Sequence, residues 1–436
     1  MTSVPSTVAS APVEATAGAA GTSSSASPAV PLPSTETIHH FQEAFSFVSH
    51  EREDVRKMAI HGIAEQSKGN HDLWHFLASP QYGPRCIDAL LQYLHAGGKN
   101  VLGDILTIFV NCSADGSCAE MLVQRKLVRK AMRLLDGMER SDQSETYVRG
   151  VQEMTLMLLN NLTASHVTAI DDLLQKDDED LRGFYLGKLH TYHERFRAEE
   201  EEVRRKVEEA EEAKKEVSAA GRADAEGQRE REEKIAVGAA AAAAHRDLNR
   251  WILHILLNLT RTLDGQEMLL EDEEWQVTLS DSLASPNPRH RYLAVQCYRN
   301  CACSPKPLYN LILKSDALVT AVHRLALKEP IADIQLSLAE FIASMLESED
   351  GMARLESVNA KKALASAVAA SKLATDGRNK SNSRVEVVEE DGVPVEAPAP
   401  SIVLGLQACE LIERSVLPYL DDVVDAYLAP GSDELD

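Results

Sequence analysis

The chain has 436 residues, of which 44% are apolar and only 5% aromatic, and its formal net charge at pH 7 is −23. A protein that binds duplex nucleic acid needs a basic face, and no cluster of Lys and Arg supplies one, so nucleic-acid binding is excluded. The negative charge is best explained by solubility, and a basic protein partner is the second explanation. No segment approaches the roughly 18 apolar residues that span a bilayer, and the lack of Lys and Arg before Arg52 argues against a targeting peptide.

The N-terminal part begins with a low-complexity segment. Residues 1–35 are mostly Ser, Ala, Thr, Pro and Val, a composition that predicts a disordered tail. Helical periodicity starts near Ile38 and continues with apolar residues at helical spacing from Val55 to Ala64. We predict armadillo-like repeats over 36–180.

Four short segments repeat the same pattern, with an asparagine late in an apolar helical run. Asparagine is a poor residue inside a helix, because its amide competes for backbone hydrogen bonds, so its recurrence at one phase indicates stacked units. The spacing is 50 residues between Asn111 and Asn161 and 42 between Asn258 and Asn300, periods typical of armadillo and HEAT repeats. The same position in the repeat is held by Glu65 before Asn111 and by Ser344 after Asn300. The four segments are Phe109–Ser113, Leu159–Thr163, Leu256–Thr260 and Tyr298–Ala302.

The long gap between Asn161 and Asn258 contains a charged helical insertion, which we place at 181–245. Within it, residues 197–215 are nearly all Glu, Arg, Lys and Ala. Apolar residues seven apart, beginning at Phe196 and Val203, make a weak coiled-coil seam conceivable. A solvated single helix is the favoured interpretation, with the alanine run that follows as a flexible return.

The C-terminal part resumes the repeats over 246–372. Trp251 belongs there to an expected core stripe with neighbouring Ile and Leu residues. An acidic flexible loop is expected at 373–400, a C-terminal capping helix at 401–428 and a disordered tail at 429–436. The fold class predicted for the whole chain is all-α, an armadillo/HEAT-like right-handed α-solenoid.

No catalytic constellation is present in the sequence. Glycine-rich phosphate loops, His-Glu-x-x-His and Gly-x-Ser-x-Gly are all missing. Cys297, Cys301 and Cys303 with His290 come closest to a metal set, but they lack the Cys-x-x-Cys spacing and a second pair. We therefore expect reduced, mostly buried thiols, no metal, no cofactor and no enzymatic activity.

The asparagines allow two interpretations, which the sequence leaves open. Their amides could line a groove and bond the backbone of an extended peptide, since an amide offers both a donor and an acceptor. They could instead only tie neighbouring helices together. Armadillo proteins that import nuclear cargo place Trp four residues before each such Asn, whereas this chain has Thr107, Met157, His254 and Gln296. The candidate protein-binding residues are Asn111, Asn161, Asn258, Asn300, Arg261 and His254.

The order of several motifs resembles one family. The motifs are Glu53-Asp54-Val55-Arg56, Val110–Ser113, Leu159–Thr163, Leu256–Arg261 with Gly265 and Leu269-Leu270, Arg299-Asn300-Cys301 after a Pro-Asn-Pro turn, Asp333-Ile334 and Ala408–Ile412. In this order they resemble the HGH-type armadillo-repeat proteins of the eukaryotic cytosol. Two features depart from that family: the insertion at 181–245, and a proline-rich stretch reduced to Lys328-Glu329-Pro330.

The resemblance implies a chaperone or adaptor that assists the folding of translation elongation factor 2, in company with the cytosolic ring chaperonin. It also implies a cytoplasmic location, with the nucleus as the alternative, and we expect a monomer without nucleic-acid or membrane partners. The alternative functions are an armadillo co-chaperone that exchanges nucleotide on a heat-shock protein of the 70 kDa class, and a general protein-interaction scaffold.

Overall fold

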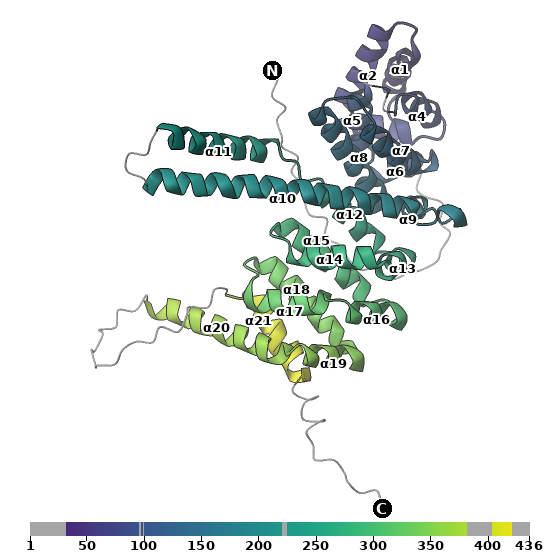
Figure 1. Cartoon of the computed structure of the whole chain (residues 1–436). Coiled ribbons are helices and arrows are strands. Elements are labelled where there is room, and N and C mark those ends of the chain that lie inside the picture. The colour runs from purple at the N-terminus through teal and green to yellow at the C-terminus, as the bar shows by residue number, and fades with distance from the viewer. Residues whose placement is uncertain (1–31, 96, 99, 220–224, 382–402, 421–436) are drawn as a thin grey trace, which may run out of the picture.

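The computed structural model describes residues 32–95, 97–98, 100–219, 225–381 and 403–420. Every regular element among these residues is a helix (Figure 1). Most of the tail expected at 1–35, the tail expected at 429–436, most of the loop expected at 373–400 and part of the capping helix expected at 401–428 lie outside the described residues. Residues 373–381, expected in the loop, are helical instead. None of the described helices is long and apolar enough to cross a bilayer.

The helices form six consecutive three-helix units, which is the armadillo-type repeat. The first helix of each unit packs against the first helix of the next, so these helices make one continuous row. We call them the ladder helices. They are α2 (Glu53–Ser67), α5 (Leu102–Cys112), α8 (Glu145–Ser165), α12 (Asn249–Leu259), α15 (Pro288–Ala302) and α18 (Ala332–Ser344).

Two further helices complete each unit. The second helices are α3 (His71–Ala78), α6 (Gly116–Gln124), α9 (Val167–Leu174), α13 (Leu263–Glu271), α16 (Lys306–Lys314) and α19 (Glu349–Ser357). The third helices are α4 (Gly83–Leu91), α7 (Leu127–Glu139), α10 (Phe184–Ala219), α14 (Glu273–Ala284), α17 (Ala317–Leu327) and α20 (Ala360–Ser381). This stack of similar units is an α-solenoid, as predicted from the helical periodicity.

The two ends of the solenoid are covered by short helices. At the N-terminal end, α1 (Thr35–Ser46) and the 3₁₀ turn η1 (Phe47–Ser49) pack on α2 and α3, with Phe41 against Phe76 at a ring-centroid distance of 5.3 Å. At the C-terminal end, α21 (Leu406–Leu411) and the following π turn η4 (Ile412–Val416) pack on α18. Capping of this kind keeps the apolar faces of the terminal repeats out of water.

Sharp turns between the first and second helices of a unit require glycine. In α13 and α19 the helix starts with a side-chain cap, from Thr262 and Ser348, that accepts the N–H of Gly265 and Gly351. A Cβ on Gly265 would lie 2.2 Å from the carbonyl oxygen of Leu259, and one on Gly351 would meet the preceding helix 1.9 Å away. The glycine thus lets the second helix turn back directly onto the end of the first.

The segment expected as an insertion divides into two parts. The first turns of α10 belong to the solenoid, because five large side chains on them are buried in its core: Tyr185, Leu186, Leu189, Tyr192 and Phe196. Beyond them α10 continues and pairs with α11 (Ala225–Ala244), and the two project from the stack as a hairpin (Figure 1).

The hairpin is held by small residues at the contact between its helices. Ala210 and Ala213 are buried there, and a Cβ on Gly238 would lie 2.4 Å from that of Ala210. The favoured interpretation of a single solvated helix with a flexible return is therefore wrong. The small side chains of the alanine run allow α11 to approach α10 closely.

A buried ion pair joins the last two units. Arg291 of α15 and Glu329, in the turn before α18, are 4% and 0% exposed. The guanidinium of Arg291 binds the carboxylate through two hydrogen bonds of 2.7 and 2.8 Å, and Arg324 of α17 adds a third at 3.3 Å. The reduced stretch Lys328-Glu329-Pro330 therefore carries a structural contact that its sequence did not indicate.

Candidate functional site

The four asparagines lie on successive ladder helices and bond each helix to the one before it. In each case the side-chain amide donates to a hydroxyl of the preceding ladder helix. The pairs are Asn111 to Ser67 (2.9 Å), Asn161 to Ser113 (3.1 Å), Asn258 to Thr163 (3.0 Å) and Asn300 to Thr260 (3.0 Å). We call this series the asparagine ladder.

The acceptor hydroxyls fix the direction of the ladder hydrogen bonds. Each of them donates its own proton to a carbonyl three or four residues earlier in its helix, so its lone pair is left to accept the asparagine amide. These backbone bonds run from Ser67 to Ala64, Ser113 to Val110, Thr163 to Leu159 and Thr260 to Leu257, at 2.7–2.8 Å. Each acceptor lies two residues after the ladder position of its own helix, a regularity visible in the sequence as Asn-x-Ser/Thr.

The ladder is shorter than the phase of the sequence suggested. Glu65 is exposed, and the first rung is supplied by Ser67 instead. At the other end Ala302 stands where an acceptor hydroxyl would be needed, and Ser344 bonds its own helix at Phe341. Between α15 and α18 the contact is made by Gln296 with Ser337 and by Arg299 with Glu340.

The other two candidate residues lie beside the ladder. Arg261 is exposed and donates to the carbonyl of Ala164 at 2.8 Å, which satisfies a free carbonyl near the end of α8. His254 is half-buried on α12, with its ring 5.9 Å from that of Trp251. Burial lowers the pKa of His254, so the ring is neutral at pH 7.

A half-exposed strip runs along the same face of the central ladder helices. Positions four and seven before a ladder asparagine share its face of the helix, and they hold Met154 and Met157 on α8 and Trp251 and His254 on α12. On α15 the position seven before Asn300 holds the buried Leu293, and its neighbour Tyr292 is 43% exposed. Trp251, expected in the core, is half-buried and packs against it, and the guanidinium of Arg250 lies 4.7 Å from its ring.

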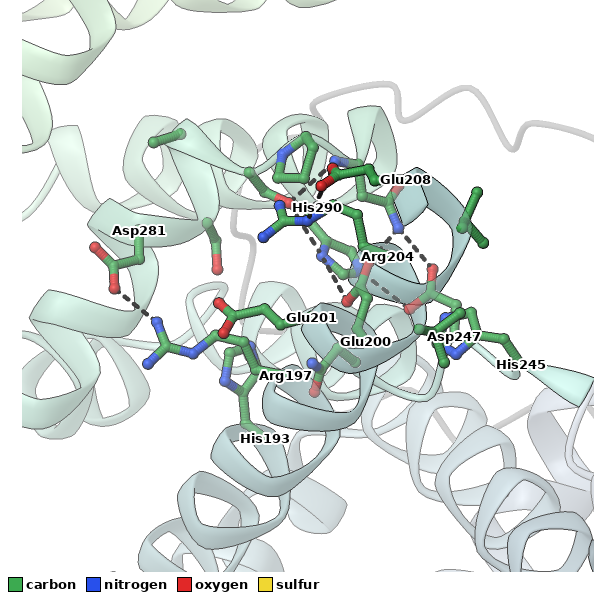
Figure 2. Close-up of a pocket in the computed structure, with 18 of the residues that line it drawn as sticks. His193, Arg197, Glu200, Glu201, Arg204, Glu208, His245, Asp247, Asp281 and His290 are labelled. Atoms are coloured by element: carbon green, nitrogen blue, oxygen red, sulfur yellow. Dashed lines mark hydrogen bonds and ion pairs between the residues drawn. The ribbon is translucent and has the colours of Figure 1, made fainter. Parts of the chain in front are cut away.

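The main cavity lies at the base of the hairpin, between α10 and the turn that precedes α15 (Figure 2). Its volume is about 720 Å³. Acidic groups predominate on its walls: six carboxylates against two arginines, with three histidines beside them. The carboxylates are Glu200, Glu201, Glu208, Glu211, Asp247 and Asp281.

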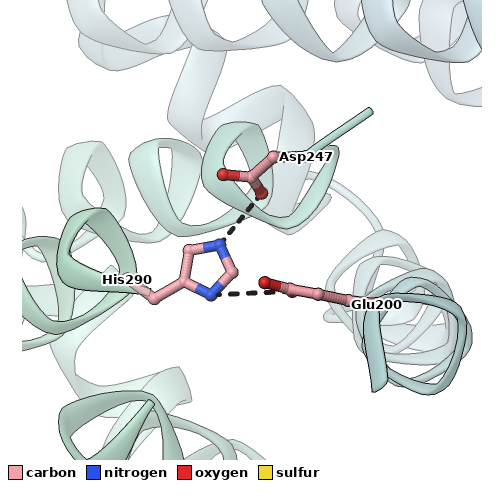
Figure 3. Close-up of side chains that lie close together, drawn as sticks. All are labelled: Glu200, Asp247 and His290. Atoms are coloured by element: carbon pink, nitrogen blue, oxygen red, sulfur yellow. Dashed lines mark hydrogen bonds and ion pairs between the residues drawn. The ribbon is translucent and has the colours of Figure 1, made fainter. Parts of the chain in front are cut away.

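Three side chains meet at one wall of this cavity, each from a different element (Figure 3). His290 of α15 is 4% exposed, and its Nε2 lies 2.9 Å from Asp247 Oδ1, while its Nδ1 lies 3.9 Å from Glu200 Oε2 of α10. Burial acts to raise the pKa of Asp247, but hydrogen bonds, chiefly from His290, outweigh it and lower this pKa to about 2. Sequence reasoning had grouped His290 with cysteines, and the structure groups it with carboxylates.

The cysteines behave as core residues. Cys297 and Cys301 are buried on α15, and burial raises the pKa of Cys301 to about 12 and holds that of Cys297 well above its usual value. All seven cysteines are free thiols, as expected, although Cys303 is exposed. Thiols with raised pKa values are poor nucleophiles and poor metal ligands.

The class of protein that the fold and this face define is an α-solenoid of three-helix, armadillo-type repeats. No protein-family model matches the chain, and no curated protein matches it. Among solved structures, a designed armadillo-repeat protein is 12% identical over 69% of this chain and 98% of that chain, with a TM-score of 0.47. A designed armadillo-repeat protein in complex with a (KR)4 peptide gives the same values.

A third solved structure, described by a phosphorylation switch in the interaction between cadherin and β-catenin, is 13% identical over 75% of this chain and 65% of that chain, with a TM-score of 0.25. At these identities and scores the likenesses establish no relationship by descent and no function.

Proposed function

We propose that this chain is a protein-binding solenoid without enzymatic activity, and that its partner lies along the ladder helices. The observation that carries the proposal is the half-exposed strip of Met154, Met157, Trp251, His254 and Tyr292. Met, Trp, Tyr and Arg are enriched at protein interfaces, where they supply large contact areas. Here Met154, Met157, Trp251 and His254 share the ladder face of α8 and α12, and Tyr292 is exposed on the next ladder helix.

The ladder adds polar recognition to this strip. The donors of its amides are used between repeats, but among the described residues no hydrogen bond reaches the Oδ1 atoms of Asn111, Asn258 and Asn300. Each of these oxygens can accept a backbone N–H of an extended partner. The two interpretations of the ladder are thus compatible: the donor of each amide ties helices together, and its acceptor serves the partner. Asn161, Arg261 and His254 belong to the same proposed surface.

We further propose that the partner is translation elongation factor 2 during its folding, with the cytosolic ring chaperonin as the downstream component. The support is the resemblance to the HGH-type family in the order of its motifs. The motif Arg299-Asn300-Cys301 includes the last ladder asparagine, and Leu256–Arg261 includes both Asn258 and Arg261. Four of the seven motifs that carry the resemblance therefore contain a ladder asparagine.

The test uses the full chain, tagged and added during translation of elongation factor 2 in a eukaryotic extract, with bound proteins identified by mass spectrometry. We expect capture of elongation factor 2, and at least a tenfold weaker capture by Tyr292→Ala combined with His254→Ala. Tyr419→Ala is the matched control, because Tyr419 is also exposed, at 56%, but lies near the C-terminal end.

Equal capture by the double variant and by the control, at unchanged melting temperature, would refute the strip as the binding surface. Capture of a 70 kDa heat-shock protein in place of elongation factor 2, with accelerated nucleotide release, would replace the proposed client by the co-chaperone alternative.

A further inference from the structure

The base of the hairpin holds a group of potential metal ligands. Glu200 comes from α10, Asp247 from the segment between α11 and α12, and His290 from the first turn of α15. One ligand atom from each lies within 4.8 Å of the other two. Figure 3 shows the imidazole of His290 between the two carboxylates, with a ring nitrogen directed to each.

The charge of this group calls for a cation. Glu200 and Asp247 have 26% and 17% of their side chains exposed, and in the described part of the chain neither forms an ion pair with a Lys or Arg. Among the described residues their ion-pair partner is His290, which carries a charge only when it is protonated. Carboxylates withdrawn from water are stable when they are paired or coordinate a metal.

The surroundings orient these groups. Asn287 accepts the N–H of Arg289 at 3.0 Å through its side-chain oxygen, so its amide nitrogen is directed at Asp247 Oδ2, 3.1 Å away. The backbone N–H of Arg250 donates to Asp247 Oδ1 at 3.0 Å. Hydrogen bonds of this kind hold ligating carboxylates in place in metal sites.

The adjoining cavity gives the group an entry path and a further imidazole. His193 lines the same cavity and is 3% exposed, and its Nδ1 makes no hydrogen bond; the nearest group is the Glu194 carboxylate at 3.5 Å. Burial lowers the pKa of His193, which keeps its ring neutral, the form that binds metals. Water has room to complete the coordination in the cavity of about 720 Å³.

We propose that Glu200, Asp247 and His290 bind one divalent first-row transition-metal ion, which clamps the hairpin to the solenoid. Ligand atoms about 2.1 Å from a zinc ion lie about 3.4 Å from one another in a tetrahedral site. Glu200 faces Nδ1 of His290 and Asp247 faces Nε2, so ligation of one ion through Nε2 requires a change of the Glu200 rotamer, which its long and partly exposed side chain allows. The imidazole favours Zn²⁺, Cu²⁺, Fe²⁺ or Ni²⁺ over Ca²⁺ and Mg²⁺, which prefer oxygen ligands.

The clamp is tested on the full chain after dialysis against a chelator, by calorimetric titration with ZnCl₂ and by thermal melting. We expect one Zn²⁺ per chain, a higher melting temperature in its presence, and no binding of Ca²⁺ at the same concentration. Glu200→Gln keeps the size of the side chain and should weaken Zn²⁺ binding at least tenfold. Glu201→Gln is the matched control, because Glu201 is the next residue of α10, lines the same cavity and is not part of the group.

Asp247→Asn and His290→Ala should also lose binding, and Glu200→Gln keeps the test valid if the more buried His290 is needed for folding. Absence of a Zn²⁺ heat and of a shift in melting temperature for the native chain would overturn the proposal. Equal binding by Glu200→Gln and Glu201→Gln would also overturn it, and would place the ion elsewhere, such as at His71 and His75, one turn apart on α3.

Discussion

The asparagine ladder makes a quantitative prediction at Asn258, its most buried member. Asn258 is 8% exposed, and its amide nitrogen lies 3.0–3.1 Å from three acceptors: the hydroxyl of Thr163 and both the backbone and side-chain oxygens of Asn160. Asn258→Ala removes all of these contacts at once. Asn300→Ala removes one contact, to Thr260, from a less buried position.

The expected cost follows from these contacts. Removing one partner of a buried hydrogen bond costs about 1–3 kcal/mol, whereas a typical exposed hydrogen bond contributes about 0.5–1.5 kcal/mol. We therefore expect Asn258→Ala to lower the free energy of unfolding by about 2–3 kcal/mol and Asn300→Ala by about 1 kcal/mol. With an unfolding entropy of about 2.1 cal/mol/K per residue, each kcal/mol lowers the melting temperature of a chain of 436 residues by about 1 °C.

The assay is thermal and urea unfolding of both single variants, together with a double-mutant cycle between Asn258→Ala and Thr163→Val. Residues that share a hydrogen bond couple by about 0.5–3 kcal/mol, whereas independent residues add within about 0.5 kcal/mol. Wild-type stability of Asn258→Ala, or additive effects in the cycle, would show that the ladder does not hold the repeats together.

Three further predictions concern the packing of the units. Glu329→Ala should cost about 3–5 kcal/mol in urea unfolding, because it leaves the buried guanidinium of Arg291 without its carboxylate; a loss below 1 kcal/mol would contradict the buried pair. Gly265→Ala should destabilise the chain because its Cβ meets a carbonyl, whereas Gly103→Ala, with open space around it, should stabilise it by about 0.5–1 kcal/mol in thermal melting. Replacing 212–237 by a short Gly-Ser turn should leave the melting temperature unchanged, since the ion pair between Arg231 and Glu216 in this segment lies within the hairpin; a large decrease would show that its tip packs on the solenoid.

The sequence was sufficient for the repeats because solenoids are local. Each unit has the same local sequence pattern, an apolar helical stripe followed by a polar turn. The asparagine segments therefore identified their ladder helices correctly. The same locality explains the error in the insertion. Tyr185 and Phe196 have the spacing of apolar residues in an amphipathic helix. The many charged residues that follow them led to the prediction that the whole of α10 is solvated.

The surface features were harder to predict, because they depend on which side of a helix the next unit covers. Trp251 has the apolar neighbours of a core residue, and only the position of Asn258 seven residues later indicates that it shares the ladder face. The group of Glu200, Asp247 and His290 joins residues far apart in sequence, from three elements. No motif spacing in the sequence indicates such a group, because its members come together only in the folded chain, where α10 passes the turn before α15.

The hydrogen bonds of the asparagine ladder give a physical reason for a binding surface centred on α8, α12 and α15. These helices are linked to their predecessors by Asn161, Asn258 and Asn300, so their mutual register is fixed by hydrogen bonds and does not depend on apolar contact alone. The strip with Met157, Trp251 and Tyr292 lies on this fixed segment. A surface whose backbone is already held in register loses less entropy when a partner binds. Beyond α15 the ladder stops at Ala302, and the strip of large half-exposed side chains ends on the same helix, at Tyr292.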